Sequence, residues 1–361
     1  MSMLKIGDRL VGGKHPTYFI ADIAANHDGD LARAKELIHL AAEAGADCAK
    51  FQNFKAEKIV SDYGFKNLGG QKSHQSRWKK SVFDIYRDAS LPESWNETLA
   101  EECRKAGVDY STSPYDFSAL DQAAELAPFI KIGSGDITWL EMLRSAASKD
   151  KPIILACGAS TMEEVERAAA TILPLNKRLA LLQCNTNYEG GENNFSHLNL
   201  SVLQTFQKRW PDIVVGLSDH TPGNVAALGA VALGGRIVEK HFTDDTTREG
   251  PDHAFSMTPS AWRTMVKHVR LLETALGNGE KRVEENERDT VVLQRRCLRA
   301  AHDLPVGHLL TENDIEALRP APTGAYTPDR MEEVVGRRLA KAMLFGEDIR
   351  PECIVKIDEK K

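Results

Sequence analysis

The sequence lacks long apolar runs and any excess of positive charge. No stretch of the 361 residues approaches the ~20 apolar residues of a membrane-spanning helix, and MSMLKIGDR at the N-terminus has no signal-peptide core. The formal net charge of -6 argues against nucleic acid or an anionic membrane as the main partner. We therefore expect a cytoplasmic protein that acts on small molecules.

Closely spaced cysteines are also absent. The six cysteines form no C-x-x-C pair, which favours reduced thiols over a disulfide framework in a chain of this length. Cys48, Cys157 and Cys184 fall within or just after apolar runs, and we expect them to be buried small hydrophobes. No tight metal motif such as H-E-x-x-H is present.

Short apolar β-type runs do recur, and helical segments separate them. They are Thr17–Ala24, Cys48–Gln52, Val108–Thr112, Phe129–Ile132, Pro152–Ala156, Leu179–Gln183, Ile213–Leu217 and Arg236–Val238. This alternation predicts an α/β fold, a (β/α)8 TIM barrel. An open doubly wound sheet is the competing fold. It usually carries a glycine-rich phosphate motif after the first strand, where this chain has Asn26-His27-Asp28-Gly29, so the barrel is favoured.

Changes in composition predict the domain boundaries. We expect a barrel domain over residues 1–280, a charged linker over 281–296, and a small mostly-β domain over 297–361 with glycine and proline turns. The polar segment from Asn53 to about Ser90 is too long for a bare connector. We expect it to be a lid with some helix of its own.

Polar residues crowd the ends of the predicted strands, where a barrel places its active site. Those expected at this mouth are Asp22, Asn26, His27, Lys50, Gln52, Ser113, Lys131, Ser134, Asp136, Ser218, Asp219, His220, Glu239, Lys240 and His241. One histidine at a strand end is usually structural. Two at successive strand ends, each beside a carboxylate, favour a shared divalent metal on His220 and His241.

Two lysines at strand positions predict an anion site. Lys50 and Lys131 need anionic partners if buried, and the hydroxyls of Ser113, Ser134 and Ser218 would complete a phosphate site. Lys131 could instead form a Schiff base, but such an enzyme needs no paired histidines. The combination favours a carbon–carbon bond reaction that uses a phosphorylated small molecule.

Several runs resemble the sialic acid synthases and, more broadly, the nonulosonic acid synthases. The resemblance covers nearly the whole chain and includes a C-terminal antifreeze-like (SAF) domain. The runs are IADIAANHDGD, CAKFQ, KIGSGD, KPIIL, GLSDHT, ALGAVALGGRIVEKHFT and GPDHAFSM. The resemblance implies a transferase that condenses phosphoenolpyruvate with an N-acetylated sugar aldehyde of the N-acetylmannosamine type. The products would be a sialic-type nonulosonic acid and phosphate.

The resemblance also implies roles for individual residues. His220 and His241 would bind manganese or magnesium. Asp22 or Glu239 would activate water, although Glu239 could instead orient a ligand histidine. The expected catalytic residues are Asp22, Lys131, Asp136 and Glu239. The expected substrate-binding residues are Lys50, Gln52, Ser113, Ser134, Thr186, Tyr188, Ser218, Asp252 and Arg319. Arg319 would come from the SAF domain of the partner in a domain-swapped homodimer.

Two other function classes and the acceptor remain open. A metal-dependent sugar aldolase or isomerase could use the same barrel, and a carbohydrate-binding protein could retain it as a scaffold. The acceptor could be N-acetylmannosamine, its 6-phosphate, or a diamino-sugar that leads to legionaminic or pseudaminic acid. Asp136, Ala156 and Thr186 depart from the family pattern and bear on this choice.

Overall fold

The computed structural model describes residues 2–69, 75 and 78–355. Residues 70–74, 76 and 77 of the expected lid, and 356–361 of the expected small domain, lie outside the described residues. The chain divides into two compact units, Met1–Gly277, called the barrel unit, and Asn278–Lys361, called the small unit. Among the described residues, no helix is long and apolar enough to cross a membrane.

Eight parallel strands form the centre of the barrel unit. They are β3 (Tyr18–Asp22), β4 (Cys48–Asn53), β5 (Asp109–Pro114), β6 (Ile130–Ile132), β7 (Ile153–Ala156), β8 (Leu179–Cys184), β9 (Val214–Asp219) and β10 (Ile237–His241). Their order is β5-β4-β3-β10-β9-β8-β7-β6, and the outer strands β5 and β6 lie against each other. The sheet is therefore a nearly closed TIM-like barrel, which confirms the predicted fold.

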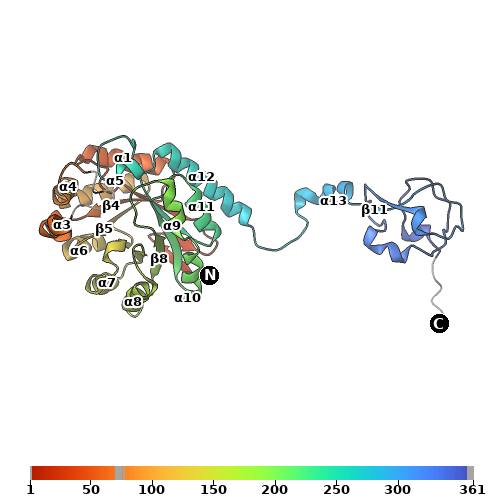
Figure 1. Cartoon of the computed structure of the whole chain (residues 1–361), viewed down its shortest axis with the longest axis horizontal. Helices are drawn as coiled ribbons and strands as arrows, with labels where there is room; N and C mark the ends of the chain where they lie inside the picture. Colours follow the sequence, from red (N-terminus) through yellow and green to blue (C-terminus); the bar gives the residue numbers. More distant parts are fainter. Residues whose placement is uncertain (1, 70–74, 76–77, 356–361) are drawn as a thin grey trace. The chain divides into compact units, whose positions relative to one another are not determined.

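Helices surround the strands, as Figure 1 shows. They are α1 (Leu31–Glu43), α5 (Asn96–Ala106), α6 (Phe117–Leu126), α7 (Leu140–Ala147), α8 (Met162–Ile172), α9 (Phe195–Leu198), α10 (Val202–Arg209), α11 (Val225–Ala232) and α12 (Pro259–Leu276). Local sequence sets their ends. The Thr161 side chain caps α8 while Glu164 reaches back to the Thr161 backbone, which together form a capping box.

Alternation along each strand separates two layers of core. Val238 of β10 faces the helices and packs with Trp262, whereas Ile237 faces the barrel interior and packs with Tyr18. The hairpin of β1 (Met3–Ile6) and β2 (Arg9–Gly12), which the sequence analysis did not predict, adds apolar side chains to this interior core. Apolar residues therefore fill the N-terminal half of the barrel and leave polar ones at the other end.

The described part of the segment between β4 and α5 contains three short helices. They are α2 (Ala56–Ile59), α3 (Asp62–Asn67) and α4 (Val82–Ala89), which confirms that the expected lid segment has helix of its own. The serines that precede α3 and α4 cap them: Ser61 accepts a hydrogen bond from the Gly64 amide, and Ser81 accepts one from the Asp84 amide.

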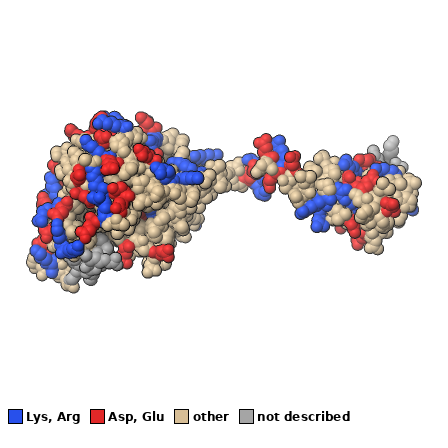
Figure 2. All heavy atoms as spheres, turned by 90° about the horizontal axis from the view of Figure 1, so that it is seen from above, with Lys and Arg blue, Asp and Glu red and all other residues tan. Residues whose placement is uncertain are grey.

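The small unit has little regular structure. It contains α13 (Arg288–Gln294) and an antiparallel pair, β11 (Cys297–Ala300) and β12 (Ile315–Leu318). Isolated bridges such as Leu304 with Met343 extend the β character, and twelve buried residues form its core. Helix α13 lies in the segment expected to be a linker. On the face of the barrel unit that Figure 2 shows, lysine and arginine are interspersed with aspartate and glutamate.

Candidate active site

A polar cavity opens at the carboxyl ends of the barrel strands. Each of the eight strands contributes a residue to it: Asp22, Lys50, Ser113, Lys131, Ala156, Cys184, Ser218 and Glu239. Two strands contribute a second residue. Gln52 follows Lys50 by two residues on β4, and His241 follows Glu239 by two residues on β10, so each pair faces the same side of its strand. We call this space the inner cavity.

Asp22 and Lys50 form a buried ion pair on one wall of the inner cavity. Lys50 Nζ lies 2.7 Å from Asp22 Oδ2, which also accepts a hydrogen bond of 3.2 Å from Gln52 Nε2. Asp22 Oδ1 accepts one from the Ala24 amide. Burial lowers the pKa of Lys50, but Asp22 and Glu239 raise it above its ordinary value, so Lys50 stays protonated.

Glu239 and Lys131 form a second buried pair. Lys131 Nζ lies 3.5 Å from Glu239 Oε1, which also accepts a hydrogen bond of 3.2 Å from Ser218 Oγ. The other oxygen, Glu239 Oε2, is buried and has no hydrogen-bond partner among the described residues. This oxygen is therefore available to accept a hydrogen bond from a bound molecule.

His220 and His241 lie side by side, with ring centroids 5.5 Å apart. His220 Nδ1 is 2.9 Å from the Asn185 carbonyl, an arrangement in which Nδ1 carries the proton and Nε2 is left as an acceptor. His241 Nδ1 is buried and unpartnered within the described structure. Burial and the neighbouring His220 and Lys50 lower the pKa of His241 well below its ordinary value, so its ring is neutral.

Two aromatic rings enclose this histidine pair. The Tyr188 ring lies 4.5 Å from that of His220, and the Phe255 ring lies 4.9 Å from that of His241. Gly190 packs closely against Phe255, since a Cβ on Gly190 would lie only 2.6 Å from the Phe255 Cβ. The Tyr188 and Phe255 rings also lie 5.5 Å from each other, so the four rings form one cluster.

A cradle of small groups lies where the segments after β6, β7 and β8 meet. The Gly158 amide donates a hydrogen bond of 2.9 Å to Ser134 Oγ, and Thr186 Oγ1 has no partner in the part of the chain that is described. A Cβ on Gly158 would meet Thr186 Oγ1 at 2.7 Å and Ser134 Oγ at 3.0 Å. Gly158 therefore keeps this space free.

A second space, the outer chamber, adjoins the inner cavity. It shares Gln52, Tyr115 and His241 with the inner cavity and adds Asp136 and Asp252, together with residues of α4. Burial raises the pKa of Asp136 to about 6, against the opposing effect of Lys131. Burial also raises the pKa of Asp252 to about 6, although the Ala25 amide donates to it.

The comparisons with known proteins agree with this geometry. Residues 37–281 match the NeuB family and residues 295–355 match the SAF domain. The N,N'-diacetyllegionaminic acid synthase of Legionella pneumophila is 34% identical, over 93% of this chain and 94% of that protein. The human N-acetylneuraminate-9-phosphate synthase is 32% identical, over 96% of this chain and 95% of that protein. The chain belongs to the NeuB family. This confirms the predicted family of nonulosonic acid synthases.

A solved structure is similar over most of the chain. The N-acetylneuraminic acid synthetase of Leptospira borgpetersenii, in complex with citrate, is 28% identical and has a TM-score of 0.69, covering 80% of this chain and 96% of that one. At the level of the family, the predicted reaction class is therefore confirmed: a transferase that condenses phosphoenolpyruvate with an amino-sugar aldehyde.

Most predicted site residues of this NeuB-family chain come together. The inner cavity contains Asp22, Lys50, Gln52, Ser113, Lys131, Ser134, Thr186, Tyr188, Ser218, His220, Glu239 and His241. Asp136 and Asp252 line the outer chamber. Arg319 is exposed at the end of β12 in the small unit.

Four of the residues expected at the mouth lie elsewhere. Lys240 and Asp219 pair with each other and alternate with cavity-facing residues, so they face the helices. Asn26 binds the Phe242 carbonyl and the Ser256 hydroxyl, and His27 packs on Trp95. The prediction was wrong for Lys240 and Asp219 because it ignored the alternation along a strand, and wrong for Asn26 and His27 because they lie in the turn beyond the end of β3.

Sequence reasoning missed Tyr115 and the site role of Cys184. Tyr115 lines both spaces, and Cys184, expected only as a buried hydrophobe, is buried and lines the inner cavity. Burial lowers the pKa of His220, but Cys184 and the Asn185 carbonyl raise it above its ordinary value. The signal for Cys184 was its spacing of two from Leu182, an interior residue of β8.

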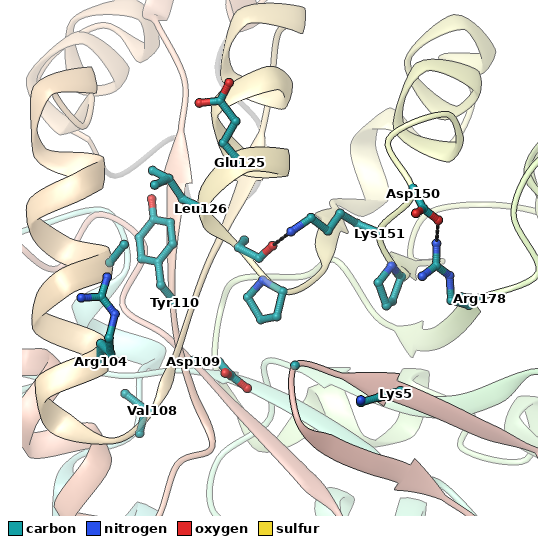
Figure 3. Close-up of a pocket in the computed structure, with 15 residues that line it drawn as sticks. Lys5, Arg104, Val108, Asp109, Tyr110, Glu125, Leu126, Asp150, Lys151 and Arg178 are labelled. Carbon is teal, nitrogen blue, oxygen red and sulfur yellow. Dashed lines mark hydrogen bonds and ion pairs between the residues drawn. The ribbon is translucent and has the colours of Figure 1, made fainter.

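A further groove lies at the N-terminal ends of the strands (Figure 3). It is lined by Lys5, Arg104 and Arg178, among others. Arg178 pairs with Asp150, and the Lys151 ammonium donates to the Ala127 carbonyl, as the dashed lines show. Active sites of TIM barrels lie at the other end, and the inner cavity lies there too.

Replacing Gly158 by alanine is expected to raise the KM for phosphoenolpyruvate at least tenfold, because the new methyl group would occupy the cradle between Ser134 and Thr186. Steady-state phosphate release measures this, and thermal unfolding measures the loss of stability expected from the close contacts of the new methyl group with Thr186, Ser134 and Cys184. Gly135→Ala is the matched control, since a Cβ there meets nothing within 4 Å. Equal effects of the two substitutions would contradict a cradle at Gly158.

Asp252→Asn is expected to stabilise the protein at pH 8 but not at pH 4. The folded-state pKa of about 6 exceeds the ordinary value of 3.8, so the folded protein binds the proton more tightly than the unfolded chain. Protonated Asp252 therefore contributes stability that is fully present below about pH 4 and is lost as the pH rises through 6. Asparagine does not ionise, so the free energy of unfolding should rise by ~3 kcal/mol at pH 8.

Urea unfolding at the two pH values checks this expectation. The exposed Asp8→Asn is the control and should change neither value. An equal gain for Asp252→Asn at both pH values would show that ionisation is not the cause.

Proposed function

We propose that this chain condenses phosphoenolpyruvate with an N-acetylated sugar aldehyde and releases inorganic phosphate and a nonulosonic acid. One observation supports it most: a single cavity holds two buried lysine–carboxylate pairs, several hydroxyls and two adjacent imidazoles. An aldolase that forms a Schiff base needs no such pair of histidines.

Phosphoenolpyruvate would bind between the two lysines. Lys50 and Lys131 supply positive charge, and hydroxyls of Ser113, Ser134, Thr186 and Ser218 supply donors. Ser113 Oγ already lies 3.4 Å from Lys50 Nζ, and the unpartnered Thr186 hydroxyl is ready to donate. Gln52, which binds Asp22, would contact the substrate at the boundary with the outer chamber.

The histidine pair fits a divalent metal. His220 Nε2 is left as an acceptor, and His241 Nδ1 is a buried nitrogen without a partner among the residues described. No cluster of three histidine, cysteine or acidic side chains occurs in the described ranges, so water or substrate would complete the coordination. A bound manganese or magnesium ion would act as a Lewis acid toward the acceptor aldehyde.

The chain's own groups account for the remaining steps. C3 of phosphoenolpyruvate forms a bond to the aldehyde carbon, whose oxygen takes up a proton. Water adds to C2 and passes a proton to a carboxylate. The C2–O bond to phosphate then breaks, the lysines hold the leaving phosphate, and a 2-keto acid remains. Tyr188, beside His220, and Asp252 would contact the acceptor.

Glu239 is better placed than Asp22 to accept the proton from the attacking water. Both oxygens of Asp22 already accept hydrogen bonds, whereas Glu239 Oε2 has none within the described residues. Glu239 binds Lys131 and Ser218, which favours a role at the water over a role in orienting a histidine. Asp22 would instead hold Lys50 in place, and Asp136 would act nearer the acceptor.

An acceptor screen with phosphoenolpyruvate and manganese tests the function. We expect phosphate release that depends on the acceptor, with a product whose mass equals acceptor plus pyruvate. Turnover of a sugar without phosphate release would favour an aldolase or isomerase. Sugar binding without any turnover, whether or not a chelator is present, would favour a carbohydrate-binding protein.

The domain-swapped homodimer remains part of the proposal. The SAF match and the exposed Arg319 support it, and the six unpaired cysteines support a reducing, cytoplasmic location. Mixed dimers test it: Arg319→Ala subunits combined with His220→Ala subunits should form one intact site per mixed dimer. Activity would then return in the mixture, whereas no recovery would contradict the shared site.

A further inference from the structure

We propose that His253 is a positioning residue, which holds in place the 252–255 turn that carries Asp252 and Phe255. It does so by bridging Asp28 and Thr243, which belong to two other parts of the barrel unit. This inference rests on the proposed condensation and adds a residue that lines neither the inner cavity nor the outer chamber. His253 therefore acts on the reaction through its neighbours.

The His253 ring is fully buried, and both of its nitrogens have partners. Nε2 lies 2.8 Å from Asp28 Oδ1, and Nδ1 lies 2.7 Å from Thr243 Oγ1. An ionised carboxylate only accepts hydrogen bonds, so Nε2 carries the proton, and in the neutral ring Nδ1 accepts from the Thr243 hydroxyl. The ring thus joins the segment after β3, the chain just beyond β10 and the 252–255 turn.

Asp28 is held independently of His253. Its backbone φ of +52° lies in the left-handed region, which aspartate tolerates better than most residues. Arg33 Nε lies 3.2 Å from Asp28 Oδ2 and a terminal nitrogen of Arg248 lies 2.7 Å from it, which leaves Oδ1 for His253. Burial raises the pKa of Asp28, but the hydrogen bonds from His253 and Arg248 lower it below its ordinary value, so the carboxylate is ionised.

The rest of the loop after β10 leaves His253 little freedom to move. A Cβ on Gly250 would lie only 2.6 Å from His253 Cδ2, so the backbone at Gly250 packs directly on the ring. At the base of the loop, the Thr243 amide donates a hydrogen bond of 3.0 Å to the Met257 carbonyl. Residues 247–250 are exposed. His253 is therefore a buried anchor between an exposed excursion of the chain and its base.

Both functional side chains of the turn depend on where the turn lies. Asp252 lines the outer chamber, and its Oδ2 accepts a hydrogen bond of 3.2 Å from the Ala25 amide. The Phe255 ring lies 4.9 Å from the His241 ring. The two lysines proposed to hold phosphoenolpyruvate belong instead to β4 and β6, which strand pairing holds. Loss of the His253 bridge should therefore weaken the binding of the acceptor and spare that of phosphoenolpyruvate.

His253→Leu, which removes both hydrogen bonds, is expected to raise the KM for the acceptor at least tenfold and to change the KM for phosphoenolpyruvate less than twofold. The acceptor is whichever of N-acetylmannosamine, its 6-phosphate and a di-N-acetylated 6-deoxy sugar the wild type uses best. His253→Gln can still donate to Asp28 and should recover most of the loss. Equal rises in both KM values, or no rise, would overturn the inference. No phosphate release by the wild type with any of the three sugars would refute the condensation instead.

Asn176→Leu is the matched control for a loss of stability. Asn176 is buried between α8 and β8, at the opposite ends of the strands, and donates a hydrogen bond of 2.7 Å to the Lys151 carbonyl. Its replacement also removes a buried loop anchor, but both KM values should stay within twofold of the wild type. A tenfold rise in the acceptor KM of this control would show that lost stability, and not the position of the turn, is the cause.

Hydrogen exchange followed by mass spectrometry gives a readout that does not depend on turnover. Amides of residues 250–257 should exchange at least fivefold faster in His253→Leu and at the wild-type rate in Asn176→Leu. Thr243→Val is a milder change that removes one hydrogen bond and keeps the shape of the side chain, so it should accelerate exchange at least twofold even if His253→Leu does not fold. Unchanged exchange in Thr243→Val and in any folded His253→Leu would overturn the inference, whatever the kinetic result.

Discussion

His220→Ala is expected to lower kcat/KM at least a thousandfold while the protein stays folded. The inner cavity holds two imidazoles, and no group of three or more histidine, cysteine or acidic ligands occurs among the described residues, so the loss of one imidazole removes half of the proposed protein ligands. The barrel core lies at the other end of the strands and does not include His220. Far-UV circular dichroism and thermal unfolding check the fold, and phosphate release checks the activity.

Manganese binding by titration calorimetry gives a readout independent of turnover. Both His220→Ala and His241→Ala should lose binding, whereas His268→Ala, an exposed histidine on α12 that contacts Asn224, should bind normally. Near-normal manganese affinity in His220→Ala would exclude the histidine pair as the metal site.

The sequence was sufficient to predict the barrel and most of the residues that line its cavity. Several of these residues are charged side chains in strands that are otherwise apolar. Lys50 and Lys131 stand in apolar strands, where an unpaired ammonium would be costly, so each required an anionic partner. Both partners exist, Asp22 and Glu239. Reasoning from burial and charge therefore predicted that each lysine needs an anion, but it did not predict that Asp22 and Glu239 are the partners.

Strand register could not be predicted as well. A shift of one residue moves a side chain from the cavity to the helix layer, and predicted strand ends carry an uncertainty of that size. Lys240 and Asp219 were placed at the mouth for this reason, and they pair behind it. In the parallel register of β10 with β9, Glu239 lies opposite Ser218, and Lys240 lies opposite Asp219 one residue further along.

Contacts between distant loops were also beyond the sequence. Phe255 meets Tyr188 only because the segment after β10 folds back over the segment after β8, with Gly190 at the crossing. The outer chamber likewise combines α4 with Asp136 and Asp252. Such encounters depend on loop conformation, for which residue periodicity contains no signal.

Lys131→Met is expected to abolish turnover and also to destabilise the fold. Lys131 is the cation nearest to Glu239 Oε1, at 3.5 Å, and both side chains are buried. Its loss leaves a buried carboxylate without its partner, which costs roughly 3–5 kcal/mol. It also removes half of the lysine charge proposed to hold phosphoenolpyruvate. Urea unfolding and phosphate release measure the two effects.

A double substitution separates these two effects. Lys131→Met with Glu239→Gln removes both charges, so most of the lost stability should return while turnover stays absent. The matched control is Lys240→Met with Asp219→Asn, which neutralises an equally buried pair that faces the helices. This control should retain the KM for phosphoenolpyruvate. A large rise in that KM would mean that any buried pair near the strand ends supports binding, and the specific role of Lys131 would be lost.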